Sequence, residues 1–481
     1  MSEYTPTIGL EIHAELKTRT KMFCDSKNDS DETRPNVNIC PICMGHPGTL
    51  PVINKEAVRR VLKVGVALGG TLADFSEFDR KNYFYPDIPK GYQISQYKYP
   101  LVTGGSLTIP GTDKKISITR IHLEEDTALS KHEHDHSLVD FNRAGVPLME
   151  LVTEPVIHSA EDAVGFAKEL QLLFRYLGVS DANMEKGELR LEANVSVSKD
   201  GTLGTKTEIK NLNSFRSVER AIEYERKRQT SVLESGGTVV QETRGWNEGE
   251  EETFSQREKE SSHDYRYFPE PDLPKLKISE IPEFAEEALR AELPELPWER
   301  RERYLSLGLK QEDAEVLVND INIASWFDQV IAILKNKELI KLASNYVVND
   351  MTGLVDTVLE KGTTKYPSPS NFAKLMRMSL DGRINSATTK KLLGYLLTGD
   401  HLDDGDPEII AQKEGLLQKS DEGELTKIAE QVVKDNPDAV AEYKAGKGAS
   451  LQYLIGQGMK LSKGSANPQV LLELLKKVLD N

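Results

Sequence analysis

The stretch TIGLEIHAEL, residues 7–16, carries the residue types of a cation site at regular spacing. Glu11, His13 and Glu15 alternate with apolar residues, and period-two alternation is typical of a half-buried β-strand. The three polar side chains therefore share one face, with neighbours roughly 6.8 Å apart. Because ligands stand only about 2–2.5 Å from a metal ion, such neighbours share one ion only if other segments supply further ligands.

Two further segments offer such ligands. The run ITRIHLEEDTALS carries Glu124 and Glu125, and VDFNRAGVPLMELVTEP places Glu150 between apolar residues. A lone carboxylate in an apolar run costs free energy unless it is paired, protonated or bound to a cation. Each stretch taken alone is more typical of a solvated sheet face or an edge glutamate. The three together indicate a divalent-cation site.

The segment CPIC places Cys40 and Cys43 at the spacing of half a zinc site, and Cys24 precedes it. A tetrahedral site needs a fourth ligand. The sequence leaves four candidates open, with the histidine favoured: Asp25, Ser26, Asp31 and His46. The alternatives are a reduced pair of thiols without metal and a knuckle that has lost its ion. Three cysteines are too few, and odd in number, for a disulfide framework.

The segment FDRKNYFYPDIPKGYQISQ interleaves cations with aromatic rings. Arg80, Lys81 and Lys90 stand among Tyr83 and its aromatic neighbours, a combination that suits phosphates and stacked bases. The alternative is a surface loop whose rings pack on the core. The sequence contains neither a GxxxxGK[ST] nor a GxGxxG motif, so any nucleotide site belongs to another class.

Lysines gather near the end of the sequence, in YKAGKG and ASLQYLIGQGMKLSKGSANPQ. They are Lys444, Lys447, Lys460 and Lys463. The net charge of −16 does not suggest a broad nucleic-acid surface. These lysines therefore indicate either a local RNA contact or a solvated helical face.

The elements that must position these residues change along the chain. Strand and helix patterns mix up to about residue 293, as in the strand GELRLEANVSVS and in helices that begin after Ser159 and Ser214. From ELPELPWERRERY onwards the pattern is helical, and TGDHLDDGDPEI is typical of a linker. We predict an α+β protein with a mixed, largely antiparallel β domain at 1–293, a helical domain at 294–403 and a helical tail at 404–481.

The composition is that of an ordinary folded protein. The 481 residues are 38% hydrophobic and 29% charged, enough for two or three domains with filled cores. No run of about eighteen apolar residues predicts a transmembrane helix. Since MSEYTPTIGLEI lacks a basic-then-apolar leader, we expect a cytoplasmic protein.

Long segments resemble the B subunits of the glutamyl/aspartyl-tRNA amidotransferases, from residue 7 almost to the end. They are IGLEIHAEL, CPICMGHPGTLPV, FDRKNYFYPDIPKGYQISQ, RIHLEED, DFNRAGVPLMELV, KTEIKNLNSF, QETRGW, DYRYFPEPDLP and GKGASLQYLIGQGMKLSKGSANPQ. The resemblance implies a cradle-shaped catalytic domain, a helical domain and a helical tail that grips tRNA. The inserted domain of the longer archaeal relative has no counterpart here, so the heterotrimeric A-B-C type is expected.

The resemblance also implies an activity and its sites. Family members convert mischarged Glu-tRNA(Gln) or Asp-tRNA(Asn) to the amide form, as ligases that use ATP, Mg²⁺ and glutamine-derived ammonia. By motif position the Mg²⁺ site falls on His13, Glu125 and Glu150, with Glu11 and Glu124 beside it. Which of Glu124 and Glu125 contacts the ion is left open. Zinc-binding members commonly carry a second cysteine two positions after the first, where this sequence has Ser26.

The expected mechanism is phosphorylation of the side-chain carboxylate by ATP, followed by displacement of phosphate by ammonia. We expect Arg80, Lys81, Tyr83, Lys90 and Arg190 to contact the nucleotide or the tRNA end. The sequence shows no Ser-Ser-Lys amidase signature, so a glutaminase (the A subunit), clamped by a small C subunit, would supply ammonia. The competing hypotheses are a tRNA-holding scaffold without catalysis and a stand-alone metal-dependent hydrolase.

Overall fold

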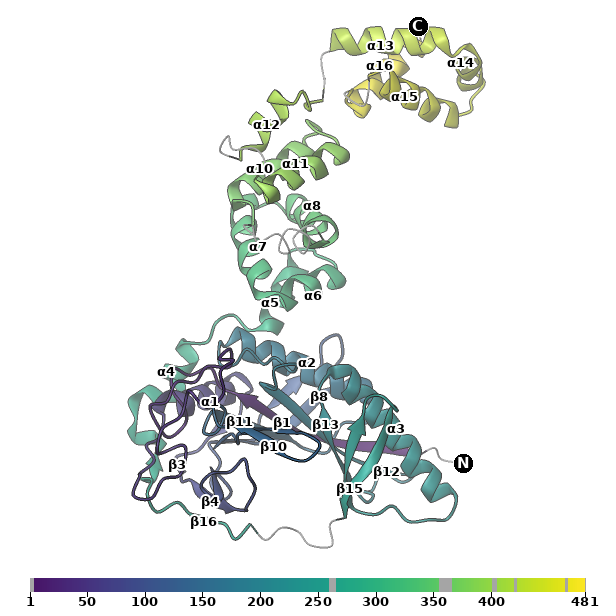
Figure 1. Cartoon of the computed structure of the whole chain (residues 1–481). Coiled ribbons are helices and arrows are strands. Elements are labelled where there is room, and N and C mark those ends of the chain that lie inside the picture. The colour runs from purple at the N-terminus through teal and green to yellow at the C-terminus, as the bar shows by residue number, and fades with distance from the viewer. Residues whose placement is uncertain are drawn as a thin grey trace. The chain divides into compact units, whose positions relative to one another are not determined.

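The computed structural model describes residues 4–258, 265–353, 366–399, 405–418, 422–462 and 466–480. The chain divides into two compact units, with the division between residues 299 and 300. The strands lie in the first unit, and the second unit is built of helices (Figure 1). The candidate cation ligands and the cysteines all belong to the first unit.

A large sheet forms the centre of the first unit. Its strands follow the order β15-β14-β13-β12-β1-β11-β8-β6-β2, and β7 pairs with β8. The pairs are antiparallel except β13 and β14, which run parallel. The strands are β1 (Thr5–Glu15), β2 (Thr71–Leu72), β6 (Val102–Thr103), β7 (Ser106–Thr108), β8 (Lys115–Glu125), β11 (Pro147–Thr153), β12 (Leu189–Ser198), β13 (Thr207–Leu212), β14 (Glu242–Asn247) and β15 (Glu252–Glu258). The predicted α+β class with a mixed, largely antiparallel sheet is confirmed.

Three small sheets accompany the large one. The strands are β16 (Phe268–Pro269), β4 (Asp79–Asn82) and β5 (Tyr92–Ser95) in one sheet, β17 (Leu276–Lys277) and β3 (Phe75–Ser76) in another, and β9 (Leu129–His132) and β10 (Ser137–Asp140) in the third. Arg80 on β4 lies opposite Phe268 on β16. The sheet of β16, β4 and β5 therefore joins the aromatic segment at residues 78–96 to residues 265–274, far along the sequence.

Strand β1 has the predicted two-sided character. Its apolar residues are buried in the main core, whereas Glu11, His13 and Glu15 are half-buried; the apolar set is Ile8, Leu10, Ile12 and Ala14. Burial of each large aliphatic side chain is worth about 1.5–3 kcal/mol. The apolar face therefore fixes the strand, and its other face presents Glu11 and His13.

Helices cover one side of the large sheet. They are α1 (Lys55–Ala67), α2 (Ala160–Tyr176) and α3 (Phe215–Glu234), and the short helices η1 (Ile278–Glu280), η2 (Pro282–Phe284) and α4 (Glu286–Ala291) follow in the chain. The predicted caps are confirmed, since Ser159 Oγ accepts from Asp162 N and Ser214 Oγ accepts from Ser217 N. Figure 1 shows α2 and α3 along one side of the sheet.

The second unit is helical, as predicted. Its elements are α5 (Pro297–Ser306), α6 (Gln311–Asn319), α7 (Ile321–Leu334), α8 (Lys337–Tyr346), the π-helix η3 (Val347–Met351), α10 (Pro369–Leu380), α11 (Ser386–Thr398), α12 (Pro407–Lys413), α13 (Glu422–Asp435), α14 (Pro437–Lys444), α15 (Ala449–Leu461) and α16 (Pro468–Asp480). Apolar residues of α13, α15 and α16 form a core of their own. The proposed domain boundaries at 293 and 403 stay predictions, and residues 400–404 lie outside the described residues.

None of the described helices is by itself long and apolar enough to cross a membrane. Helices α6 and α7 meet that test only as a pair, and the chain bends by 118° between them. The apolar residues Phe327 and Val330 of α7 are fully buried, as in the core helix of a folded unit.

Candidate functional site

Three adjacent strands bring predicted site residues together on the polar side of the sheet. His13 on β1 lies opposite Glu150 on β11, and Glu150 lies opposite His122 on β8. Directly opposed residues of neighbouring strands project to the same face, so these three side chains form a row. Glu11 and Glu124 lie two positions along β1 and β8 from this row and share its face. We call these five residues the carboxylate–histidine cluster.

The side chains of the cluster lie within reach of a common ion. His13 Nε2 is 3.4 Å from Glu150 Oε2, 3.7 Å from Glu11 Oε1 and 3.9 Å from Glu124 Oε1. His122 Nε2 is 3.4 Å from Glu150 Oε2 and 4.0 Å from Glu124 Oε2. Glu11 is the most exposed member, whereas the side chains of His122, Glu124 and Glu150 are almost completely buried.

Mutual electrostatics explain the ionisation of the cluster. Burial alone would raise the pKa of Glu150, but the charges of His122 and His13 and a hydrogen bond from His13 hold it far below its ordinary value. Burial opposes a charged His13, yet Glu150, Glu124 and Glu11 raise its pKa to about 9. Burial, followed by the charge of Glu150, raises the pKa of Glu11 to about 7. Burial lowers the pKa of His122.

The donor set fits a divalent cation. Ligand atoms of Glu11, His13 and Glu150 lie within 4.8 Å of one another, as do those of His122, Glu124 and Glu150. The two sets share Glu150, which is the centre of the cluster. Three carboxylates supply the oxygen ligands that Mg²⁺ prefers. Protons held on Glu11 and His13 would leave when a cation binds, because ligands must be deprotonated.

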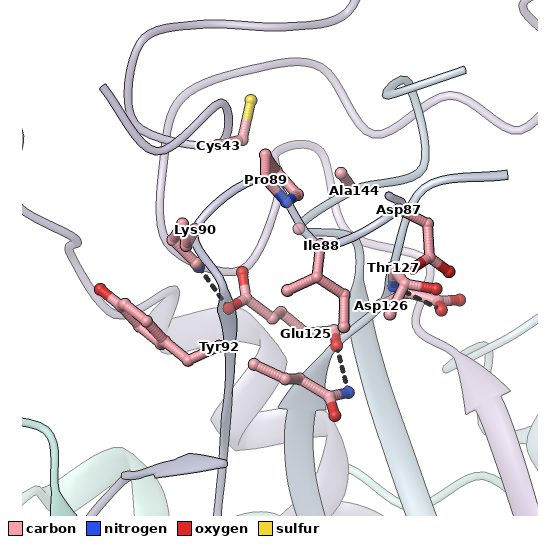
Figure 2. A pocket seen from close by; sticks show the side chains of 12 residues that line it. Cys43, Asp87, Ile88, Pro89, Lys90, Tyr92, Glu125, Asp126, Thr127 and Ala144 are labelled. Atoms are coloured by element: carbon pink, nitrogen blue, oxygen red, sulfur yellow. Dashed lines mark hydrogen bonds and ion pairs between the residues drawn. The ribbon is translucent and has the colours of Figure 1, made fainter. Parts of the chain in front are cut away.

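Glu125 is not part of this cluster. Successive residues of a strand point to opposite faces, and Glu125 Oε1 accepts a hydrogen bond from Ile94 N at 2.9 Å and pairs with Lys90. Figure 2 shows this ion pair at the edge of a pocket that Cys43 also lines. The structure therefore does not bring together the expected ligands His13, Glu125 and Glu150. Glu124 occupies the place expected of Glu125.

Lys81 is a predicted cation that faces the cluster. Burial opposes its charge, but the charges of Glu124, Tyr267, Tyr83 and Glu150 raise its pKa above the ordinary value. Its Nζ lies 5.9 Å from the centroid of the Tyr83 ring. Lys81 lies on β4, which pairs with β5, and Ser95 of β5 donates a hydrogen bond of 3.0 Å to Glu124 Oε2. Strand β5 therefore connects the strand of Lys81 to the cluster.

The other predicted cations have carboxylate partners within the framework. Arg80 binds Glu270 through two hydrogen bonds of 2.7 and 2.8 Å, and Lys90 pairs with Glu125. Arg190 Nη2 lies 2.7 Å from Asp126 Oδ2. Arg80 and Lys90 therefore hold loops and strands in place, and their contact with a nucleotide stays a prediction, as does that of Arg190.

Sequence reasoning did not select two members of the site. His122 belongs to the cluster, and Arg120 Nη2 lies 3.3 Å from Glu150 Oε1. The sequence pattern that could have identified them is alternation along β8. Every second position there from 120 to 124 is polar: Arg120, His122 and Glu124. A strand with that period places all three on the face that carries Glu150.

A second acidic group adjoins the cluster. Ligand atoms of Glu11, Glu192 and Glu208 lie within 4.8 Å of one another. Lys210 Nζ stands between two of them, at 2.7 Å from Glu192 Oε2 and 3.4 Å from Glu208 Oε1. An internal ammonium thus already neutralises part of this group.

The comparisons with known proteins decide the family. The model of the GatB/GatE catalytic domain matches residues 6–282, and that of the GatB domain matches residues 325–479. The chain belongs to the GatB/GatE family. It is similar to proteins named as the B subunit of aspartyl/glutamyl-tRNA(Asn/Gln) amidotransferase. That of Dehalococcoides mccartyi is 45% identical over 499 residues, covering 100% of both chains. That of Caldanaerobacter subterraneus is 44% identical over 484 residues, covering 99% of both.

The three cysteines of this GatB/GatE family chain lie together. The sulfur atoms of Cys24, Cys40 and Cys43 are within 4.8 Å of one another. Ser26 Oγ is 3.7 Å from Cys43 Sγ, so Ser26 is the candidate fourth ligand that contacts a thiol. His46, which the sequence favoured, is not in this group.

A buried ammonium also faces the thiols. Lys21 is fully buried, and its Nζ lies 3.8 Å from Cys43 Sγ. A hydrogen bond with Cys24 lowers the pKa of Cys43 to about 4, with a further contribution from the charge of Lys21, and the same hydrogen bond raises the pKa of Cys24. Three sulfurs within 4.8 Å of one another fit a zinc ion, and Ser26 Oγ lies close to one of them. Zinc binding stays a prediction.

The tail lysines stand on exposed helix ends. Lys444 closes α14, Lys460 lies near the end of α15, and Lys447 lies between the two helices and forms a 3.0 Å ion pair with Glu442. Lys463 lies outside the described residues. The role of these lysines in RNA binding stays a prediction.

Proposed function

We propose that this chain is the B subunit of a heterotrimeric, tRNA-dependent amidotransferase. It would use ATP to convert Asp-tRNA(Asn) and Glu-tRNA(Gln) to Asn-tRNA(Asn) and Gln-tRNA(Gln). The names of relatives that match the whole chain support this proposal. The observation that carries it is the convergence of Glu124 and Glu150 on His13, at 3.9 and 3.4 Å.

The chemistry explains why such a site is needed. A carboxylate resists attack by ammonia because it is anionic and its oxygen is a poor leaving group. Attack of a carboxylate oxygen on the γ-phosphorus of ATP forms one P–O bond and breaks the bond to the β-phosphate, releasing ADP. Ammonia then attacks the acyl carbon, the C–O bond to phosphate breaks, and a proton leaves the new amide nitrogen. A bound Mg²⁺ would offset the charge on the phosphate oxygens.

Each residue of the site has a distinct part in this proposal. Glu124 and Glu150 would hold Mg²⁺, with His13 as a further ligand once it has lost its proton. Lys81 would neutralise the transferring phosphoryl group, since its strand β4 pairs with β5, whose Ser95 donates a hydrogen bond to Glu124. Because Arg80 is held by Glu270, its part is to fix strand β4, which carries Lys81.

The proposed partners follow from the need for ammonia, because the sequence of this chain shows no amidase signature. Ammonia has to arrive unprotonated and shielded from water, which would otherwise hydrolyse the acyl phosphate. A glutaminase (the A subunit), held in place by a small C subunit, would supply it. We place the complex in the cytoplasm with its tRNA substrates, and zinc in the three-cysteine site with a structural role.

Reconstitution with the A and C subunits tests the proposal. Mischarged tRNA(Asn) and tRNA(Gln) are supplied separately, with and without ATP, and the amide formed on tRNA is measured together with ADP. We expect the Glu150→Gln complex to lose at least about a hundredfold in rate, because charge stabilisation of this kind is worth about 10²–10³. Glu161→Gln, at an exposed position of α2, is the matched control.

The competing hypotheses predict other results. A scaffold without catalysis would form amide at the same rate with Glu150→Gln. A stand-alone hydrolase would turn over without ATP or tRNA. Either result would reject the proposed function.

A further inference from the structure

A set of aromatic rings lies on the surface around the sheet of β16, β4 and β5. The rings of Tyr97 and Tyr267 are stacked, with centroids 4.4 Å apart and planes at 13°. Tyr265 meets Tyr267 edge-on at 5.9 Å, and Tyr83 meets Tyr265 edge-on at 5.8 Å. We call these four residues the tyrosine platform. Tyr97 is 66% exposed, so much of this residue is accessible to a ligand.

The platform is held rigidly by the backbone beneath it. The side chain of Asn82 donates hydrogen bonds to the carbonyl oxygens of Tyr265 and Arg266, at 3.1 and 2.8 Å. Arg266 has a φ of 45°, in the left-handed region that non-glycine residues rarely adopt. Tyr97 N donates to Asp79 Oδ2 at 3.0 Å. Backbone strain that the surroundings enforce is typical of ligand-binding segments.

Positive charge accompanies these rings. Lys81 Nζ lies 5.1 Å from the centroid of the Tyr265 ring, and Lys98 and Arg266 are exposed beside Tyr97 and Tyr265 in the sequence. A cationic aromatic surface is notable on a chain with a net charge of −16. It suits bases that are stacked and phosphates that are neutralised nearby.

Lys81 connects the platform to the reaction centre. Its Nζ lies over the Tyr265 ring, and its strand β4 pairs with β5, where Ser95 donates a hydrogen bond of 3.0 Å to Glu124 Oε2. A ligand that places its rings on the platform therefore brings the adjoining atoms to the carboxylate–histidine cluster.

We propose that the tyrosine platform stacks the unpaired terminal bases of the aminoacylated RNA end. This inference rests on the proposed function and adds how its RNA substrate is positioned. In an aminoacyl ester the amino acid hangs from the last ribose, so stacked terminal bases bring the side-chain carboxylate towards Lys81. Single-stranded RNA ends are commonly held by aromatic stacking, because every base presents a π-face.

Both ATP and tRNA carry a base that could stack on the platform, and KM values of the reconstituted complex show which of the two does so. Loss of one base–ring stack weakens binding about fivefold to a hundredfold. Tyr97→Ala should therefore raise KM for mischarged tRNA by that factor while KM for ATP stays at the wild-type value. Tyr97→Phe keeps the ring and should restore KM. Phe254→Ala, at an exposed ring on β15, should resemble wild type.

A binding measurement that does not depend on catalysis completes the test. Mischarged tRNA with 2-aminopurine as its terminal base should lose fluorescence on binding wild-type complex and Tyr97→Phe, and keep it on Tyr97→Ala. A rise in KM for ATP instead of tRNA, or equal quenching by Tyr97→Ala, would overturn the inference. Failure of the wild-type complex to form amide while quenching persists would reject the proposed function and leave the platform standing.

Discussion

Glu124 and Glu125 are consecutive residues of β8, yet their carboxylates lie in different surroundings. Glu124 Oε1 is 3.9 Å from His13 Nε2, whereas Glu125 Oε1 accepts a hydrogen bond from Ile94 N at 2.9 Å. The alternating geometry of the strand sends the first to the cluster and the second to the loop that carries Lys90. Glu124 thus belongs to the proposed cation site, whereas Glu125 supports the fold.

Substitution of the two glutamates should have different consequences. We expect Glu124→Gln to raise the Mg²⁺ concentration needed for amide formation, and to lower the maximal rate about a hundredfold. Glu125→Gln removes the charge partner of Lys90, so it should lower the free energy of unfolding by about 1–3 kcal/mol. Metal titrations of activity and urea unfolding of both variants measure this. Equal Mg²⁺ requirements in the two variants would contradict the assignment.

The cation-free protein should lose stability as pH rises from about 6.5 to 9. The pKa values of Glu11 and His13 in the fold, about 7 and about 9, exceed their ordinary values of 4.5 and 6.5. Between about pH 6.5 and 9 the folded state holds more protons on His13 than the unfolded state does, so the free energy of unfolding falls with pH. The corresponding loss for Glu11 lies between about pH 4.5 and 7. The loss should be on the order of 2 kcal/mol for the strongly shifted His13.

Thermal melts with EDTA and with Mg²⁺ test this pH dependence. Mg²⁺ should raise Tm more at pH 9 than at pH 6.5, because fewer protons then compete for the ligands. Glu11→Gln and His13→Asn should each flatten the curve recorded with EDTA. If both variants kept the wild-type slope, other groups would be responsible for the pH dependence.

Local patterns predicted much of the fold. Alternation placed Glu11 and His13 on one face of β1, and the caps Ser159 and Ser214 begin α2 and α3 as expected. These features depend on backbone geometry within a few residues. The sequence alone is sufficient to predict such short-range features of the fold.

Contacts between distant segments could not be predicted in this way. Alternation groups Glu124 with His122 on one face of β8, but only the register of β8 against β11 brings that face to Glu150. Likewise, the Glu270 that binds Arg80 lies 190 residues away in the sequence. Pairings of this kind are properties of the tertiary fold, because no local pattern carries them.

Zinc binding should depend on the residue at position 26. Ser26 Oγ stands 3.7 Å from Cys43 Sγ, where other zinc sites have a fourth thiolate, and a hydroxyl is a weaker zinc ligand than a thiolate. We expect Ser26→Cys to retain zinc against a chelator at concentrations that strip the wild-type chain. Metal analysis after chelator titration measures this, with Ser30→Cys as the control. Equal retention by Ser26→Cys and the wild type would show that Ser26 does not limit the site.

The exposed tail lysines should set the salt dependence of tRNA binding. Each phosphate contact releases counterions, so Lys444→Gln or Lys460→Gln should weaken binding and lower the slope of log K against log salt by about one. Lys447 is the matched control, because its ion pair with Glu442 already offsets part of its charge, and its replacement should change the slope less. Filter binding of the reconstituted complex between low and moderate salt gives these slopes. Unchanged slopes in Lys444→Gln and Lys460→Gln would mean that these helix ends are solvated surface, and that the tRNA is held by other parts of the complex.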